Sequence, residues 1–209
     1  MALSEQQKQK KLLKKKQKKS AVVQAIKSFM SVSAVSCADY PLYESVVANS
    51  LFELGIGEVV IARRLPNGQL AASIFIVDVF CLGVKNTFFR VASNDEYEYL
   101  KQKATSDGRH FVSIHQSCAR KLLEGAVEYA KNLGFSSHPD YKKMAALFGA
   151  IDASACPVAY EYGKDNKPYY IRGPNESVAE AKKIVDKLYE KCGEGGYNFL
   201  IMTDENPFD

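Results

Sequence analysis

EVVIARRL at residues Glu58–Leu65 and LAASIFIVDVFCLGV at residues Leu70–Val84 are the two stretches that decide the fold. Both are rich in β-branched residues. Between them lies Pro66-Asn67-Gly68, in which the proline presets φ and the glycine tolerates a positive φ. The sequence therefore predicts a β-hairpin. Both faces of the second stretch are apolar, which is typical of a central strand covered on both sides. Asn86–Val91 is expected to add a third strand.

Asp78 is the one carboxylate inside the apolar second stretch. A carboxylate buried in a strand is costly unless it is paired, hydrogen-bonded or bound to a metal. One interpretation is a metal-binding aspartate on a first strand, as ribonuclease H-like nucleases use. The other is a buried aspartate held by backbone N–H groups or by an arginine, since buried polar groups are usually satisfied structurally.

Apolar periodicity predicts four helices around the hairpin. They are Glu44–Leu54, Ser93–Lys103, Gln116–Leu133 and a segment that opens at Ser136–Asp140 and runs to Phe148. The third has a continuous apolar stripe and is followed by a glycine suited to end it. Glu124 and Glu128 lie one turn apart at the edge of that stripe. They could face Asp78 across a cleft, although glutamates at such positions are more often solvated.

The last third of the chain predicts a β-turn-β-α-β unit. Its expected elements are strands at Val158–Tyr162 and Tyr169–Arg172, a helix at Ser177–Cys192 in which Ser177 and Glu180 have the spacing of a capping box, and a strand at Tyr197–Met202. Aromatic and basic side chains gather here: Tyr160, Tyr162, Tyr169, Tyr170, Lys164, Lys167 and Arg172. Such residues on a sheet can stack on and clamp single-stranded nucleic acid, and tyrosine is also an ordinary residue of half-exposed strands.

These elements predict an α+β fold with an antiparallel three-stranded unit, a helical middle and a C-terminal β-β-α-β unit, which could share one sheet. The expected organisation is a disordered basic arm at residues 1–20, a short helix and linker at 21–38, a single α+β domain at 39–203 and an acidic tail at 204–209. A likeness to the ribonuclease H-like layout is an analogy of fold alone.

The N-terminal arm, at residues 1–20, concentrates the positive charge of the chain. It contains eight lysines and one glutamate, a net charge of +7, whereas residues 21–209 carry 20 basic and 23 acidic side chains, a net charge of −3. The lysines are Lys8, Lys10, Lys11, Lys14, Lys15, Lys16, Lys18 and Lys19. Such a block is expected to be disordered alone, because like charges repel and little can be buried. It predicts contact with the phosphates of RNA, DNA or a ribosomal surface. The alternative is a solvated tail that aids solubility, and a membrane surface fits less well for lack of bulky anchors.

Composition and cysteine placement favour a cytoplasmic protein. No apolar run reaches membrane-spanning length, and no hydrophobic segment of the secretory kind follows the N-terminal lysines. The five cysteines are scattered, odd in number and without a C-x-x-C pair, so we expect reduced thiols and neither a zinc ribbon nor a redox motif. The three histidines show no metal-ligand spacing.

Three stretches resemble a group of uncharacterised bacterial proteins. They are LFELGIG at Leu51–Gly57, VDVFCLGVK at Val77–Lys85 and GFSSHPDY at Gly134–Tyr141, joined by the later Tyr162-Gly-Lys-Asp165. The resemblance covers about residues 40 to 200, and its most specific part is Val77–Lys85. No established activity attaches to that group, so the resemblance assigns no role to any residue. It implies a bacterial, cytoplasmic protein.

Three functions remain in view. The first is non-enzymatic binding of nucleic acid, meaning RNA or a ribonucleoprotein and secondarily DNA, by the lysine-rich arm, with no cofactor and no membrane partner. The second is a metal-dependent nuclease in which Asp78 is the first ligand of a divalent metal and Glu124, Glu128 or Asp152 assists, because two-metal phosphoryl chemistry needs several converging carboxylates. The third is a protein-interaction module that docks on an acidic partner. The familiar nucleotide-binding and hydrolase motifs do not occur.

Overall fold

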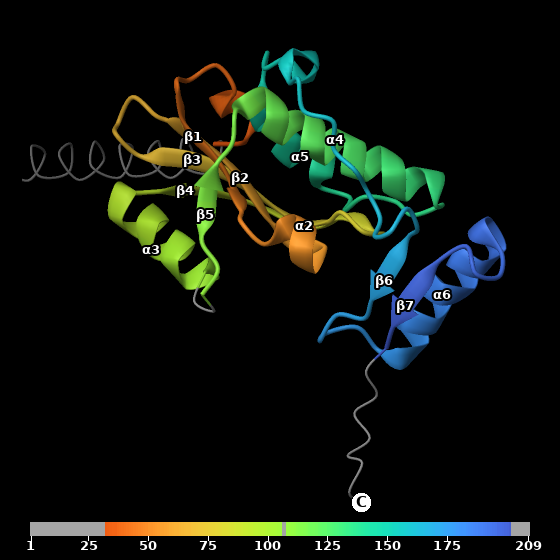
Figure 1. Cartoon of the computed structure of the whole chain (residues 1–209). Helices are drawn as coiled ribbons and strands as arrows, with labels where there is room; N and C mark the ends of the chain where they lie inside the picture. The colour runs from red at the N-terminus through yellow and green to blue at the C-terminus, as the bar shows by residue number, and fades with distance from the viewer. Residues whose placement is uncertain (1–31, 106–107, 202–209) are drawn as a thin grey trace, which may run out of the picture. The chain divides into compact units, whose positions relative to one another are not determined.

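A hairpin of β2 and β3 forms the centre of the computed structural model, which describes residues 32–105 and 108–201 (Figure 1). β2 spans Ile56–Arg64 and β3 spans Leu70–Asp78, and the two strands pair antiparallel along their whole lengths. Gly68 adopts a φ of +83° in the turn between them, a conformation that an L side chain rarely accepts. The predicted hairpin is therefore confirmed.

Three further strands extend the hairpin into a five-stranded antiparallel sheet, so the α+β class is confirmed. They are β1 at Leu42–Ala48, β4 at Gly83–Ala92 and β5 at Phe111–Ser113, and the order across the sheet is β4-β3-β2-β1-β5. The predicted helix at Glu44–Leu54 is wrong, because Glu44–Ala48 belongs to β1 and only the end of the segment forms the short helix α2 at Leu51–Leu54. The closely spaced apolar residues at the end of β1 are buried on both faces of the sheet.

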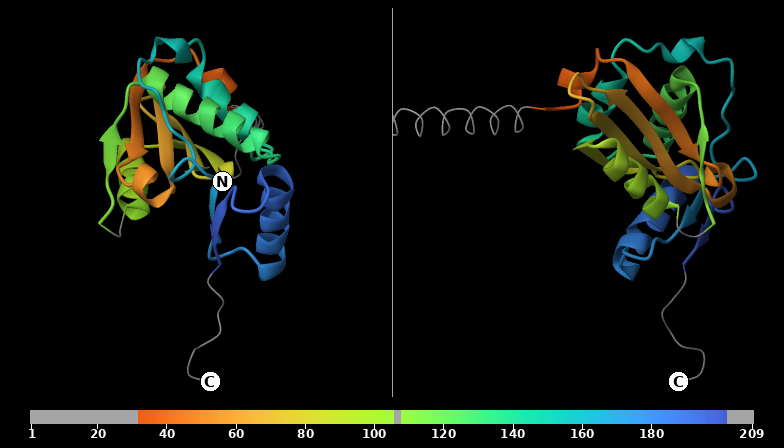
Figure 2. Two further views of the ribbon diagram at one scale, coloured as in Figure 1. Left: turned by 45° about the vertical axis from the view of Figure 1, so that its right-hand side comes forward. Right: turned by 90° about the vertical axis from the view of Figure 1, so that its left-hand side faces the viewer.

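Helices cover both faces of the sheet, as Figures 1 and 2 show. On one face, Tyr97 of α3 (Asn94–Ala104) packs into a buried cluster with Val60 and Ala72. On the other face, Phe75 of β3 packs edge-on against Tyr141, the first residue of α5 (Tyr141–Ala145). Helix α4, at Gln116–Asn132, covers the same face as α5. The double covering explains why both faces of β3 are apolar, as the sequence predicted.

The helix boundaries agree closely with the apolar periodicity in three cases. α3 begins after Ser93, whose side chain accepts a hydrogen bond from the Glu96 N–H, and ends at Ala104, one residue beyond the prediction. α4 ends at Asn132, one residue short of the prediction. α6 spans Val178–Cys192 and carries the predicted capping box, in which Ser177 and Glu180 satisfy each other's backbone N–H groups.

The second apolar stretch, Leu70–Val84, is not one strand. β3 ends at Asp78, and the chain then reverses through four residues before β4 begins at Gly83, whose φ is +68°. A Cβ on Gly83 would lie 2.9 Å from the carbonyl oxygen of Ala126, so α4 leaves room only for glycine there. Asp78 is therefore a strand-end residue at a buried turn.

The C-terminal unit is simpler than predicted. β6 (Tyr169–Ile171) and β7 (Asn198–Leu200) pair in parallel and form their own two-stranded sheet, with α6 connecting them. Val158–Tyr162 is not a strand, so the unit is β-α-β and the shared sheet that we considered is absent from the described residues. The predicted hairpin loop is reduced to a tight turn closed by a single bridge between Lys164 and Lys167.

Backbone hydrogen bonds fix this unit to the turn after β3. The N–H of Gly163 donates to the carbonyl of Val79 at 2.9 Å, and the N–H of Tyr169 donates to the carbonyl of Phe80 at 3.1 Å. Below them, Cys81 packs into a buried cluster whose members include Tyr170, Ala181 and Leu188. The turn is therefore shared between the two sheets.

A disulfide ties the connector before the C-terminal unit to α4. Cys118 and Cys156 are bonded, and the Lys121 ammonium donates to the carbonyl of Cys156 at 2.9 Å. The expectation that all five cysteines are reduced is thus wrong for this pair, because the fold brings together two residues 38 positions apart. Cys37, Cys81 and Cys192 are free thiols.

Some of the predictions concern residues outside those described. These are the basic arm at residues 1–20, the short helix at 21–30 and the acidic tail at 204–209. Among the residues that are described, no helix is both long enough and apolar enough to cross a membrane.

Candidate binding cleft

Asp78 lies at the bottom of the buried turn and is held by the backbone. Its Oδ1 accepts hydrogen bonds from the N–H of Phe80 at 2.9 Å and from the N–H of Cys81 at 2.8 Å. The residue is 7% exposed. Burial raises the pKa of this carboxyl to about 6, although the backbone donors and the nearby Lys85 oppose that rise. Of the two arrangements that we expected for Asp78, the structure shows the one with backbone donors.

A cleft of about 170 Å³ opens beside Asp78, where the end of the large sheet meets β6. Three separate parts of the chain line it: the end of α2 with the start of β2, the turn after β3 with the start of β4, and β6 with the loop that follows it. The lining residues are Leu54, Gly55, Ile56, Asp78, Phe80, Lys85, Tyr169, Ile171, Arg172, Gly173 and Pro174. The walls are therefore mostly apolar and aromatic, with a few charged groups.

Glycine at position 55 makes this arrangement possible. Gly55 ends α2 with a φ of +78°, and an added Cβ would lie 2.0 Å from Cδ2 of the Phe80 ring. The ring of Phe80 thus occupies the space that a side chain at position 55 would need. This contact could not be found from the sequence, because the two residues lie 25 positions apart.

Glu176 organises the charged side of the cleft. Its Oε1 accepts from the Lys85 ammonium at 2.5 Å, its Oε2 accepts from the Tyr170 hydroxyl at 2.6 Å, and its carbonyl accepts from Nε of Arg172 at 2.7 Å. Burial alone would raise the pKa of Glu176, but the hydrogen bonds from Lys85 and Tyr170 outweigh it and the pKa is lowered. Glu176 thus holds two cations, Lys85 through its carboxylate and Arg172 through its backbone carbonyl.

Aromatic rings make up another part of the cleft and its surroundings. The rings of Phe80 and Tyr169 are 6.2 Å apart, and the Lys164 ammonium lies 5.3 Å from the centre of the Tyr169 ring. A second pair, Phe52 of α2 and Tyr160, stacks almost parallel at 5.8 Å, and Phe52 is 45% exposed. Both pairs combine a C-terminal tyrosine with a ring from the first half of the chain.

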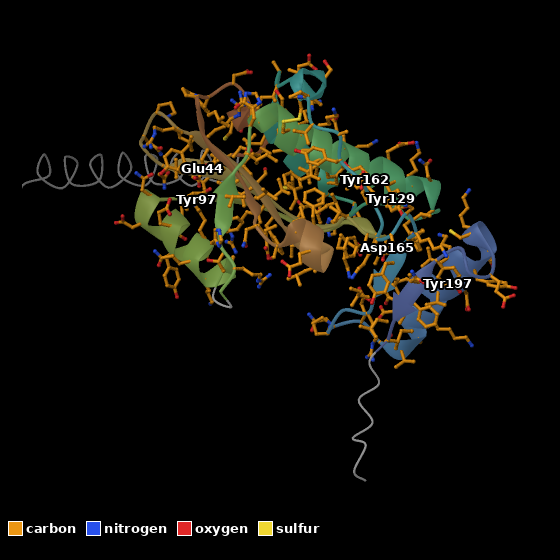
Figure 3. All side chains as sticks on the ribbon, viewed as in Figure 1. Glu44, Tyr97, Tyr129, Tyr162, Asp165 and Tyr197 are labelled. Carbon is orange, nitrogen blue, oxygen red and sulfur yellow. A yellow bond between two sulfur atoms is a disulfide. The ribbon has the colours of Figure 1, made fainter. Side chains whose placement is uncertain are left out.

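The tyrosine group predicted from the sequence is divided by the structure. Tyr170 is fully buried, and Tyr162 stacks on Tyr129 at 5.7 Å and donates its hydroxyl to the carbonyl of Leu122 (Figure 3). Of the four tyrosines, Tyr169 lines the cleft and Tyr160 stacks on the exposed Phe52. Phe52, Phe80 and Lys85 were missed, since nothing in their local sequence links them to the tyrosines.

The carboxylates considered for catalysis have separate partners. Glu124 pairs with Arg120 at 2.7 Å, and Glu128 pairs with Lys131 at 3.3 Å. Asp152 accepts from the N–H and the hydroxyl of Ser154, both at 2.8 Å, at the start of a short 3₁₀ helix. Within residues 32–105 and 108–201, no group of three or more His, Cys, Asp or Glu side chains could hold a metal ion. The structure does not gather these acids around Asp78.

The eight arm lysines lie outside the described residues. Comparisons of the chain with family models, with curated proteins and with solved structures found no match. The case for a function therefore depends on the chemistry of the chain itself.

Proposed function

We propose that this protein binds nucleic acid, as RNA or as a ribonucleoprotein, without catalysing a reaction, and that the lysine-rich arm supplies the contacts to phosphate. The observation that carries the proposal is the separation of charge along the chain. Residues 1–20 have a net charge of +7, and residues 21–209 have a net charge of −3. A mildly acidic body would repel a polyanion, so the attraction has to come from the arm.

The physical basis is the release of counterions. Each lysine that neutralises a phosphate displaces a condensed cation from the nucleic acid, which makes affinity fall with salt in proportion to the number of contacts. Lysine is a compact point charge on a flexible stem, so eight of them within one short arm suit a mobile polyanion without selecting a sequence. Specificity would then depend on other parts of the molecule.

The described residues support binding better than cleavage. Cleavage by two metal ions requires several carboxylates within a few ångströms of one another. Asp78 instead uses Oδ1 to hold a turn, and the other three candidate acids have partners of their own. The cleft beside Asp78 is lined by aromatic and cationic groups, which suit a ligand held by stacking and charge.

The test compares three versions of the full chain across a salt series, with fluorescently labelled single-stranded RNA and its duplex as probes. With the native arm we expect a log–log slope of up to about −5 for single strands, if all the arm lysines engage. Replacing the eight lysines by glutamine should flatten the slope toward zero, whereas replacing them by arginine should keep it, because only the first change removes charge.

An unchanged slope in the glutamine version would refute the proposal, as would the absence of binding by the native chain at low salt. A glutamine version that loses solubility but has the same weak affinity would identify the arm as a solvated tail. The third function is docking on an acidic protein. It predicts that polyglutamate competes with RNA for the native and arginine versions, which carry the positive charge, and does not compete for the glutamine version.

A further inference from the structure

We propose that the cleft between the β3–β4 turn and β6 binds one nucleotide of a single-stranded nucleic acid, with its base against the aromatic wall and its phosphate toward the lysines. This inference rests on the proposed function, because the arm would supply most of the affinity. The cleft would add a preference for unpaired over paired strands. Its lining and the groups around it carry the proposal.

The wall chemistry favours a flat, unsaturated ligand group. Tyr169 supplies a half-buried ring, Phe80 is 6% exposed and packs beside it, and the aliphatic side chains of Leu54, Ile56 and Ile171 complete the lining. Bases have π faces that stack on such rings in any sequence, which is how proteins bind single strands without reading them. A cleft of about 170 Å³ has room for one small group and no room for a double helix.

The cations are placed for a phosphate attached to that base. Lys85 and Arg172 line the cleft and are oriented by Glu176, and Lys164 lies over the rings of both Tyr169 and Phe80. These three cations lie near two carboxylates, Glu176 and the Asp78 that accepts hydrogen bonds from the turn. A neutral apolar ligand would gain nothing from these cations, whereas a nucleotide uses both the rings and the charge.

A neighbouring surface offers a place for the next base. Phe52 is stacked on Tyr160 and remains 45% exposed, and Leu54 of the same short helix lines the cleft. The exposed part of the Phe52 side chain is accessible to a ligand. Consecutive bases could therefore meet Phe52 and then the cleft. An acidic peptide would match the cations but would leave these rings without a partner.

Single-tryptophan reporters test the proposal in the full chain, which contains no natural tryptophan. Leu54→Trp places the reporter at the cleft, where the native side chain is 46% exposed. Tyr99→Trp is the matched control on α3, where the native side chain is 61% exposed and does not line the cleft. We expect oligouridylate of about twelve nucleotides to quench only the first reporter, and a duplex to quench neither.

Charge variants give a second readout that does not depend on tryptophan. Leu54→Glu should weaken binding of the single strand by about tenfold and leave duplex binding unchanged, because it repels the phosphate and blocks stacking at the cleft alone. Tyr99→Glu adds the same charge elsewhere and should change neither affinity. Both positions are exposed, so the variants should keep the melting temperature of the native chain.

The outcomes separate the cleft from the arm. Steep, arm-dependent RNA binding with a silent reporter at position 54 and no loss in Leu54→Glu would overturn the cleft proposal and leave the proposed function intact. Absence of RNA binding by any version would overturn the proposed function and, with it, this inference. Stronger quenching of Leu54→Trp by polyglutamate than by oligouridylate would assign the cleft to an acidic peptide and so also overturn it.

Discussion

Replacing Asp78 by asparagine should stabilise the protein at neutral pH. The amide oxygen of asparagine can accept the same two hydrogen bonds, from the N–H groups of Phe80 and Cys81, without placing a charge in the buried turn. Burial raises the carboxyl pKa from 3.8 to about 6. Each pKa unit corresponds to about 1.4 kcal/mol, so the ionised carboxylate costs the native state about 3 kcal/mol near neutral pH.

The sign of the pH dependence follows from which state binds the proton more tightly. The folded protein keeps the Asp78 proton to a higher pH than the unfolded chain does. The carboxyl therefore costs nothing below about pH 4, and its cost grows as pH rises through about 6 and is complete near pH 7. The advantage of Asp78→Asn over the native protein should follow the same curve.

Urea unfolding at a series of pH values measures this difference directly, because all other titrating groups are common to the two proteins. Asp78→Ala is the matched control. It leaves both turn N–H groups without their acceptor, at a cost of about 1–3 kcal/mol each, so it should be less stable than Asp78→Asn at every pH. A destabilised Asp78→Asn at neutral pH would show that the carboxylate is favourably ionised in the fold. A difference that does not vary with pH would show that folding leaves the pKa of Asp78 unchanged, and either result would refute the reasoning.

Two other changes test features around the cleft and the connector. Reduction of the Cys118–Cys156 disulfide, which spans 38 residues, should lower the free energy of unfolding by about 4 kcal/mol. Urea titrations with and without dithiothreitol measure this loss. A variant with both cysteines replaced by serine that still responds to the reductant would contradict this explanation. Gly55→Ala should lose at least about 2 kcal/mol, because its Cβ would overlap Phe80 at a positive φ. Gly68→Ala has a φ of +83° and open space, so it should lose only about 1 kcal/mol, and equal losses at the two glycines would refute the steric argument.

The sequence predicted the elements whose stability is local. The capping box at the start of α6 and the turn between β2 and β3 depend on residues within a few positions of each other, and both were found as expected. The apolar stripe of α4 also predicted its limits to within one residue. In each case the periodicity and the end signals point to the same structure.

The errors arise where distant residues decide the outcome. Ser45 to Ala48 are buried in a row because β1 lies inside the sheet, and that pattern resembled a helix face. The turn after Asp78 was missed for a related reason. Its residues Val79, Phe80 and Cys81 are buried under later parts of the chain, so their apolar character indicates burial and says nothing about the local backbone. A hydrophobic pattern cannot distinguish a buried turn from a buried strand.

The cleft could not be predicted for the same reason. Its walls come from α2, the β3–β4 turn and β6, and no motif connects them. Asp78 attracted attention because a carboxylate among apolar residues is unusual, and the cleft does lie beside it. The residues around it that suit a ligand, such as Phe80 and Lys85, are ordinary in their local sequence.

The shared turn also affects the order in which the chain can fold. The carbonyls of Val79 and Phe80 obtain their hydrogen bonds from Gly163 and Tyr169, which follow them by more than eighty positions. During synthesis, the β2–β3 hairpin can form early, but this turn stays incomplete until most of the chain has left the ribosome. An early hairpin with a late closing step should fold more slowly than its local turn signal suggests. Fragments that end before Gly163 should expose this buried turn and aggregate.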